Sequence, residues 1–374
     1  MKIGIVCYPT YGGSGVVATE LGIALAAKGH QVHFITYSQP VRLGEFNSNI
    51  FFHEVVVSEY PLFQYEPYEV TLTSKMVDVA EHEQLDLLHV HYAIPHASAA
   101  YLAKQILKEK GINIPIVTTL HGTDITLVGK DPSFEPVISF SIQHSDAVTA
   151  VSESLKQDTY THFKTKKDIS VIPNFICLDK YKATKGCARG AFAKESEKIV
   201  MHVSNFRKVK RVEDVVRVFR KLRSNINAKL VLVGDGPERN NVEHLCRELE
   251  VYNDTRFLGK VKNVEELLGF ADIFLLPSES ESFGLAALEA MAASVPVVST
   301  NTGGIPEVNV QGKTGFLTNV GDVDGMAKFA LEILTNDELC AEMRINARKR
   351  AEEFSLENIL PMYMKVYEEV IKNK

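Results

Sequence analysis

Short apolar runs alternate with helix-length amphipathic segments along almost the whole chain. The strand-like runs are continuous in Val, Ile and Leu rather than alternating, which is typical of strands covered on both faces. Helical segments fill most of the gaps, and repeated β-α units indicate right-handed crossovers in parallel sheets. One series of strands is predicted at residues 2–8, 32–36, 51–57, 85–91, 114–120, 146–152 and 169–173, and a second at 198–204, 229–235, 255–259, 272–278, 296–300 and 315–318.

These strands are too many for one open sheet, so the sequence predicts an α/β fold of two doubly wound domains. The break falls in the polar segment 177–196, which lacks strand character. We therefore expect domains at 1–176 and 177–354. A last helix follows another helix without a strand between them, so residues 355–374 are expected to cross back to the first domain. Ligands of such sheets bind beyond the carboxyl ends of the strands, which directs attention to the loops there.

Composition narrows the function classes. The chain has 374 residues, of which 45% are apolar and 24% charged, and a net charge of -6, so neither nucleic acid nor a membrane is an expected partner. The first residues enter a strand directly, without the apolar region of a secretion signal. Five scattered cysteines without a CxxC pair indicate a reducing cytoplasm rather than a disulfide framework. A homo-oligomer remains possible.

A glycine-rich loop follows the first predicted strand. Gly12, Gly13 and Gly15 allow close approach of a ligand, and the helix that starts there suits an anion. Gly13-x-Gly15-x-x-Ala18 also fits the dinucleotide fingerprint, but the acid expected near the end of the second strand is absent from residues 31–44. This absence counts against a nicotinamide enzyme. A tight strand–helix turn without a ligand is the alternative.

Histidines follow two later strands. His89 and His91 share one face of a strand, and because no carboxylate cluster lies beside them, a hydrogen-bonded pair is favoured over a metal site. His121 lies at the end of the next strand, where it could donate to a substrate oxygen or transfer a proton. Thr123 or Asp124, just after it, could also cap a helix.

The first strand of the second domain is followed by four cations, of which at most two are expected to face a cleft. Their place at a strand end favours a phosphate clamp over a nucleic-acid patch. The cluster comprises Arg207, Lys208, Lys210 and Arg211.

Two glutamates flank the start of a later helix. Glu281 precedes it and Glu289 lies inside it, so the carboxylates could hold two sets of hydroxyls, such as a sugar and a ribose. The N–H groups at the helix start suit an anion. Solvated surface glutamates are the alternative. The pair Asp322-x-Asp324 is interpreted as helix capping rather than as a metal site.

The segments CYPTYGGSGVVATELG, HVHYAIPHA, TTLHGTDIT and ESFGLAALEAM together resemble the retaining GT-B glycosyltransferases of family 4. Within this family the chain resembles the enzymes that join N-acetylglucosamine from UDP-GlcNAc to L-malate, the first step of bacillithiol biosynthesis. The resemblance covers essentially the whole chain. It implies two Rossmann-like domains facing a central cleft, with the acceptor on the first and the nucleotide sugar on the second. It also implies retention, giving an α-glycoside. Because no convincing metal site is found among the residues, we expect the reaction to need neither a cofactor nor a metal. Another small-molecule or lipid acceptor is the alternative.

The resemblance also implies roles for residues. Relatives space their Arg and Lys five residues apart, whereas Arg207 and Lys210 are three apart, so Lys208 and Arg211 stay open as partners of Arg207. Lys75 is a further candidate to bind a carboxylate. The implied catalytic residues are His121, Glu281, Arg207 and Lys210; the donor site adds Gly13, Ser282, Phe283, Gly284, Leu285 and Glu289, and the acceptor site is Ser14, Gly15, Tyr92 and Thr123.

Overall fold

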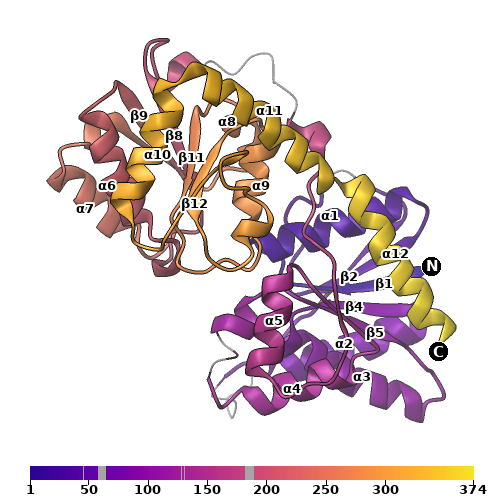
Figure 1. The fold of residues 1–374 in the computed structure, drawn as a ribbon. Helices are drawn as coiled ribbons and strands as arrows, with labels where there is room; N and C mark the ends of the chain where they lie inside the picture. The colour runs from indigo at the N-terminus through magenta and orange to yellow at the C-terminus, as the bar shows by residue number, and fades with distance from the viewer. Residues whose placement is uncertain (45, 58–64, 128, 130, 182–188) are drawn as a thin grey trace. The chain divides into compact units, whose positions relative to one another are not determined.

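The computed structural model describes residues 1–44, 46–57, 65–127, 129, 131–181 and 189–374. The chain forms two compact units (Figure 1). Unit 1 comprises Met1–Asn174 and Glu357–Lys374, and unit 2 comprises Phe175–Leu356. The chain therefore leaves unit 1 two residues before the predicted boundary and returns to it for its last helix. Residues 182–188 of the predicted boundary segment lie outside the described residues.

Unit 1 is built on a parallel sheet of seven strands in the order β3-β2-β1-β4-β5-β6-β7. The chain runs outward from β1 in one direction and then from β4 in the other, so the order reverses between these two strands. The edge strand β3 is half exposed, whereas β4 and β5 are buried throughout. The strands are β1 (Lys2–Val6), β2 (Gln31–Thr36), β3 (Ile50–Glu54), β4 (Leu87–His91), β5 (Ile116–Leu120), β6 (Ala147–Ala150) and β7 (Ile169–Val171).

Helices cover both faces of this sheet. Apolar residues of α2 and α3 form a core with Val6, Ile35 and Val90 on one face. On the other face, α12 places Tyr367 against His89. The helices are α1 (Gly13–Ala27), α2 (Tyr68–Glu83), α3 (Ser98–Glu109), α4 (Glu135–His144), α5 (Glu153–His162) and α12 (Leu356–Lys372).

Unit 2 repeats the plan with six parallel strands in the order β10-β9-β8-β11-β12-β13, reversing between β8 and β11. Its core joins the buried residues of these strands to α6 and α10. The strands are β8 (Lys198–Val203), β9 (Ala228–Val233), β10 (Thr255–Gly259), β11 (Ile273–Leu276), β12 (Val297–Thr300) and β13 (Gly315–Thr318). The helices are α6 (Val212–Arg223), α7 (Arg239–Glu248), α8 (Val264–Leu268), α9 (Leu285–Ala292), α10 (Val323–Thr335) and α11 (Asp337–Glu353).

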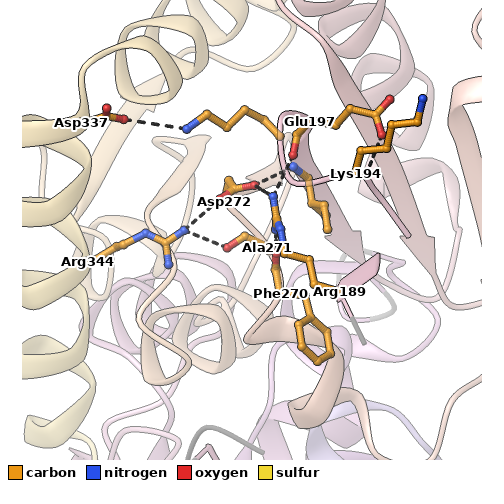
Figure 2. Close-up of polar contacts among 10 residues, drawn as sticks. Arg189, Lys194, Glu197, Phe270, Ala271, Asp272, Asp337 and Arg344 are labelled. Carbon is orange, nitrogen blue, oxygen red and sulfur yellow. Dashed lines mark hydrogen bonds and ion pairs between the residues drawn. The ribbon is translucent and has the colours of Figure 1, made fainter. Parts of the chain in front are cut away.

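A carboxylate at the amino end of β11 ties separate segments of unit 2 together (Figure 2). Asp272 Oδ2 accepts hydrogen bonds from the backbone of Ile199 at 2.7 Å and from Arg189 at 2.8 Å. Arg344 of α11 reaches the other oxygen at 3.4 Å and donates to the carbonyl of Ala271 at 3.1 Å. This network fixes β8, β11 and α11 at the end of the sheet opposite the carboxyl-end loops.

The two doubly wound sheets confirm the predicted fold class. Most strands are shorter than predicted, because apolar residues continue into the loops: the run at 272–278 is strand only over Ile273–Leu276. The capping interpretation of Asp322 is also confirmed, since its carboxylate accepts the N–H of Gly325 at the start of α10.

Candidate functional site

The loops after β8 and β11 meet where the strand order of unit 2 reverses, the position at which open α/β sheets bind ligands. Lys210 Nζ donates to Glu281 Oε1 at 2.6 Å, and Ser278 Oγ donates to the same oxygen at 2.8 Å. The Lys210 and Glu281 side chains are 21% and 13% exposed. The structure thus joins two predicted site residues in a largely buried ion pair. Ser278, which sequence reasoning missed, was marked only by its place at the strand end.

Backbone contacts hold these loops in place. The N–H of Glu279 donates to the carbonyl of Val209 at 2.8 Å, linking the two loops. The carbonyl of Glu281 accepts the N–H of Gly304 at 2.9 Å. Gly303 has φ 56°, and a Cβ there would lie 1.9 Å from the carbonyl oxygen of Glu281. The loop after β12 can therefore pack closely against the backbone of Glu281, because position 303 is glycine.

The helix start beside Glu281 has the predicted form. Gly284 is the N-cap of α9, and Phe283 is buried against Phe354, which anchors the turn. Ser282 and Leu285 are partly exposed. Glu289 lies inside α9, one turn after its first residue, and is also partly exposed. A helix N-terminus next to a lysine offers N–H dipoles and a positive charge to the same anion.

The four cations after β8 take different positions. Lys210 pairs with Glu281, whereas Arg211 donates through Nε to Asp214 Oδ2 at 2.6 Å. Asp214 is buried, so this contact holds Arg211 against α6. Arg207 and Lys208 are exposed, and among the contacts of the described residues it is Lys210 that pairs with Glu281. Three cations were candidates to bind the diphosphate together with Arg207. Arg211 is already bound to Asp214 and Lys208 is exposed, whereas Lys210 lies beside Glu281 at the strand-order reversal.

In unit 1 the reversal lies between β1 and β4, and the loops after these strands also meet there. Tyr92 OH donates to Ser14 Oγ at 2.7 Å. Burial raises the pKa of Tyr92 to about 12, so its phenol stays protonated. Gly15 packs the start of α1 against the preceding loop: a Cβ there would lie 2.5 Å from the carbonyl oxygens of Tyr8 and Thr10. Gly13 and Thr123 are exposed, and Thr123 makes a side-chain hydrogen bond with Tyr92.

His121 stands beside this hydroxyl pair. Its ring centroid is 5.2 Å from that of Tyr92, and its Nε2 lies 2.7 Å from Nδ1 of His91. Burial, together with His96, lowers the pKa of His121 to about 3, so the imidazole is neutral at pH 7. A neutral imidazole can donate or accept a hydrogen bond, but it brings no positive charge to a substrate.

Asp124 links two loops of unit 1, a role that the sequence did not predict. Its carboxylate accepts the N–H of Ala93 at 2.8 Å and that of Gly122 at 3.0 Å, so it ties the loop after β4 to the loop after β5. Burial raises the pKa of Asp124 to about 6 despite these hydrogen bonds. A residue that caps a helix accepts N–H groups that follow it in the chain. Ala93 and Gly122 both precede Asp124, so Asp124 does not cap a helix through these hydrogen bonds.

His89 and Lys75 are both engaged with other side chains of unit 1. His89 contacts Thr119 Oγ1 through Nε2 and Tyr367 OH through Nδ1, each at 2.7 Å, which confirms the hydrogen-bonded interpretation of this histidine. Lys75 pairs with Asp78 on α2 at 3.4 Å rather than joining the group around Ser14.

Comparison with known proteins gives consistent results. The family model "Glycosyltransferase Family 4" matches residues 11–180, and "Glycosyl transferases group 1" matches residues 188–350. The N-acetyl-alpha-D-glucosaminyl L-malate synthase of Bacillus anthracis is 51% identical, over 100% of this chain and 98% of that protein.

Two solved structures show the fold. A sucrose-phosphate synthase from Thermosynechococcus elongatus aligns with a TM-score of 0.83 at 20% identity, covering 100% of both chains. The Anabaena HepE protein in complex with UDP-glucose aligns with a TM-score of 0.82 at 19% identity, covering 99% of this chain and 100% of that one. Within the described residues, no helix has the length and apolar character that crossing a membrane requires.

Proposed function

The chain belongs to the glycosyltransferases of family 4, and on this basis we propose that it transfers N-acetylglucosamine from UDP-GlcNAc to the hydroxyl group of L-malate. The transfer retains configuration and gives the α-glycoside that begins bacillithiol biosynthesis. The name of the Bacillus anthracis relative, half identical over the whole chain, supports this donor and acceptor. We also propose that the reaction takes place in the cytoplasm.

The observation that carries the donor site is the Lys210–Glu281 pair at the strand-order reversal of unit 2. The diphosphate of UDP binds at the N–H groups of α9, with Arg207 and Lys210 supplying positive charge. Glu281 holds hydroxyls of the sugar, and Glu289 holds the ribose. Preorganised donors of this kind each stabilise a developing oxyanion by about 3–4 kcal/mol.

The acceptor binds to the hydroxyl and amide groups of unit 1. Malate is a small dianion, and the protonated phenol of Tyr92, the hydroxyls of Ser14 and Thr123, and the N–H of Gly15 are hydrogen-bond donors suited to its carboxylates. His121, buried and neutral beside Tyr92, contacts the donor sugar near the reacting carbon.

In the proposed reaction the bond between the anomeric carbon and the diphosphate oxygen breaks as the malate oxygen bonds to the same face of the sugar. The proton of the malate hydroxyl passes to the departing phosphate, so no protein carboxylate acts as nucleophile. Lys210 and Arg207 stabilise the charge that accumulates on UDP. We propose that these groups act without a metal or cofactor, so prolonged chelation leaves the activity intact.

UDP release from UDP-GlcNAc, measured with and without L-malate, tests the proposal. We expect rapid release with malate and little without it, because the acceptor supplies the attacking oxygen. A glycoside of malate whose anomeric proton shows the α configuration completes the evidence. Release with an inositol phosphate or a lipid acceptor but not with malate would keep the glycosyltransferase assignment and overturn the acceptor.

A further inference from the structure

Two histidines and a glutamate gather in unit 1, away from the loops that carry the proposed active site. His33 lies on β2, His53 on the edge strand β3, and Glu83 is the last residue of α2. One ligand atom from each lies within 4.8 Å of the others. The carbonyl of Glu83 accepts a hydrogen bond from Lys2 at the start of β1. Glu83 thus lies near the amino end of β1, whereas His33 and His53 lie within β2 and β3.

His33 is the least satisfied member of this cluster. Its side chain is 1% exposed, and its Nε2 has no hydrogen-bond partner within the described part of the chain. Its Nδ1 lies 3.0 Å from Nε2 of His53, and its ring stacks on Phe51 with centroids 4.6 Å apart. The two nitrogens that face each other, and between which a metal ion could be held, are Nδ1 of His33 and Nε2 of His53.

Charged groups of both signs lie near the two imidazoles. Burial lowers the pKa of His33 to about 4, with His53 and Lys2 adding to the effect and Glu83 opposing it. Burial also lowers the pKa of His53, with Lys75 adding to the effect and Glu83 and Asp78 opposing it. Both imidazoles are thus neutral at pH 7, the form in which imidazole binds metals, and a carboxylate stands close to both.

We propose that His33, His53 and Glu83 bind one zinc ion. Two imidazole nitrogens and a carboxylate oxygen are a common ligand set for zinc, whereas calcium and magnesium prefer oxygen alone. Two nitrogens on a tetrahedral zinc lie about 3.3 Å apart, close to the 3.0 Å between the facing nitrogens of His33 and His53. His53 and Glu83 are partly exposed, so a water molecule can complete the coordination.

Such an ion would join three elements. β3 is the edge strand of its sheet, and β2 is its neighbour. A zinc ion bound by one residue from each, and by the end of α2, would hold this edge in register. The site is independent of the proposed glycosyl transfer, so its test uses metal binding rather than turnover.

The experiment titrates the full-length protein, without an affinity tag and stripped of metal by a chelator, with Zn²⁺ in a calorimeter. We expect one ion per chain, and an affinity at least about 100-fold weaker in His53→Gln and in Glu83→Gln. His82→Gln and Glu81→Gln are matched controls on α2, outside the cluster, and should bind as the wild type does. Circular dichroism verifies folding, and Glu83→Gln decides alone if His53→Gln does not fold.

Cobalt provides a second measurement. Co²⁺ bound at this site should give the d–d absorption of a four-coordinate ion without a thiolate charge-transfer band, since the cluster contains no cysteine. Absence of saturable Zn²⁺ binding, binding unchanged in both ligand variants, or a thiolate band would each overturn the proposal.

Discussion

At the residue scale, Lys208 and Lys210 lie two positions apart on the same short turn, yet they have different surroundings. Lys210 meets Glu281 and is 21% exposed, whereas Lys208 is exposed to solvent. A diphosphate at the start of α9 would lie near Lys210, and its negative charge can replace that of Glu281 as the partner of the lysine. The two lysines therefore form a matched pair for mutation.

We predict that Lys210→Ala lowers kcat/KM for UDP-GlcNAc by about 100-fold or more, because it removes a charge that stabilises the departing UDP. Lys208→Ala should stay within about twofold of the wild type, since that charge is already solvated. Steady-state kinetics at saturating malate measure both. Equal losses in the two variants would contradict the assignment of Lys210.

Which of the four cations after β8 lies beside Glu281 could not be predicted from the sequence. Their location after β8 was predictable from the strand pattern, but their directions depend on the backbone of the turn. Arg211 has φ 48°, a left-handed conformation that is unusual for arginine, and is held by Asp214. Both the turn and the partner are set by packing of α6, which a pattern of residue types does not contain.

At the element scale, buried histidines form a layer at the carboxyl ends of β4 and β5. Burial lowers the pKa of His89 and of His121 to about 3, and that of His96 to about 4. An unfolded chain would titrate these groups near 6.5, so it binds more protons than the folded protein between these values. Stability conferred by the neutral imidazoles is present above pH 6.5 and is lost as the pH falls toward 3–4.

We therefore predict that the free energy of unfolding falls between pH 7 and pH 5. Each such histidine contributes up to about 1.4 kcal/mol per pH unit at the lower end of this range. Asp124, whose pKa is raised to about 6, acts in the opposite direction but is a single group. Urea unfolding at pH 7, 6 and 5 measures the slope.

His96→Gln should reduce this slope by about 1.4 kcal/mol per pH unit, while the exposed His82→Gln should leave it unchanged. A slope near zero in the wild type would show that the histidine layer takes up protons without unfolding.

The Asp272 network gives another test at this scale. Asp272→Asn removes the charge shared by Arg189 and Arg344 and should lower the free energy of unfolding by about 2 kcal/mol. The acid Asp337, the first residue of α11, is 97% exposed and lies 3.8 Å from Lys198 (Figure 2). Asp337→Asn should leave stability unchanged. Chemical denaturation compares the two; similar midpoints would argue against an anchoring role.

The elements themselves were largely predictable, because continuous Val/Ile/Leu runs and glycine-rich turns are local signals. Contacts between loops were not. The tie from Asp124 to Ala93 spans 31 residues, and Ser278 acquires its partner through the fold of a loop. The metal-capable cluster likewise joins His33, His53 and Glu83 from three elements, and no spacing in the sequence marks it.

At the scale of the whole molecule, helix α12 belongs to unit 1, the unit that also contains β1. Tyr363 and Tyr367 of α12 are fully buried, and Tyr367 contacts His89 of β4. Truncation after Ser355 should therefore destabilise unit 1 although every residue of its sheet is retained. Tyr367→Phe, which removes one hydrogen bond, should cost about 1 kcal/mol.

Protease resistance and thermal unfolding, monitored for each unit by its characteristic fragments, would check this. Lys365→Ala, on the exposed side of the same helix, is the control. If the truncated protein kept a protease-resistant unit 1, the helix would be dispensable.

This arrangement makes unit 2 an insertion within unit 1. During synthesis the ribosome makes the seven strands of the first sheet before unit 2, but it makes the residues of α12 that cover His89 only after unit 2. A nascent unit 1 must therefore keep this face of its sheet uncovered by α12 until residues 357–374 have been translated. A faithful isolated domain would accordingly require residues 1–174 to be fused to residues 357–374, whereas residues 175–356 can be expressed as one uninterrupted segment.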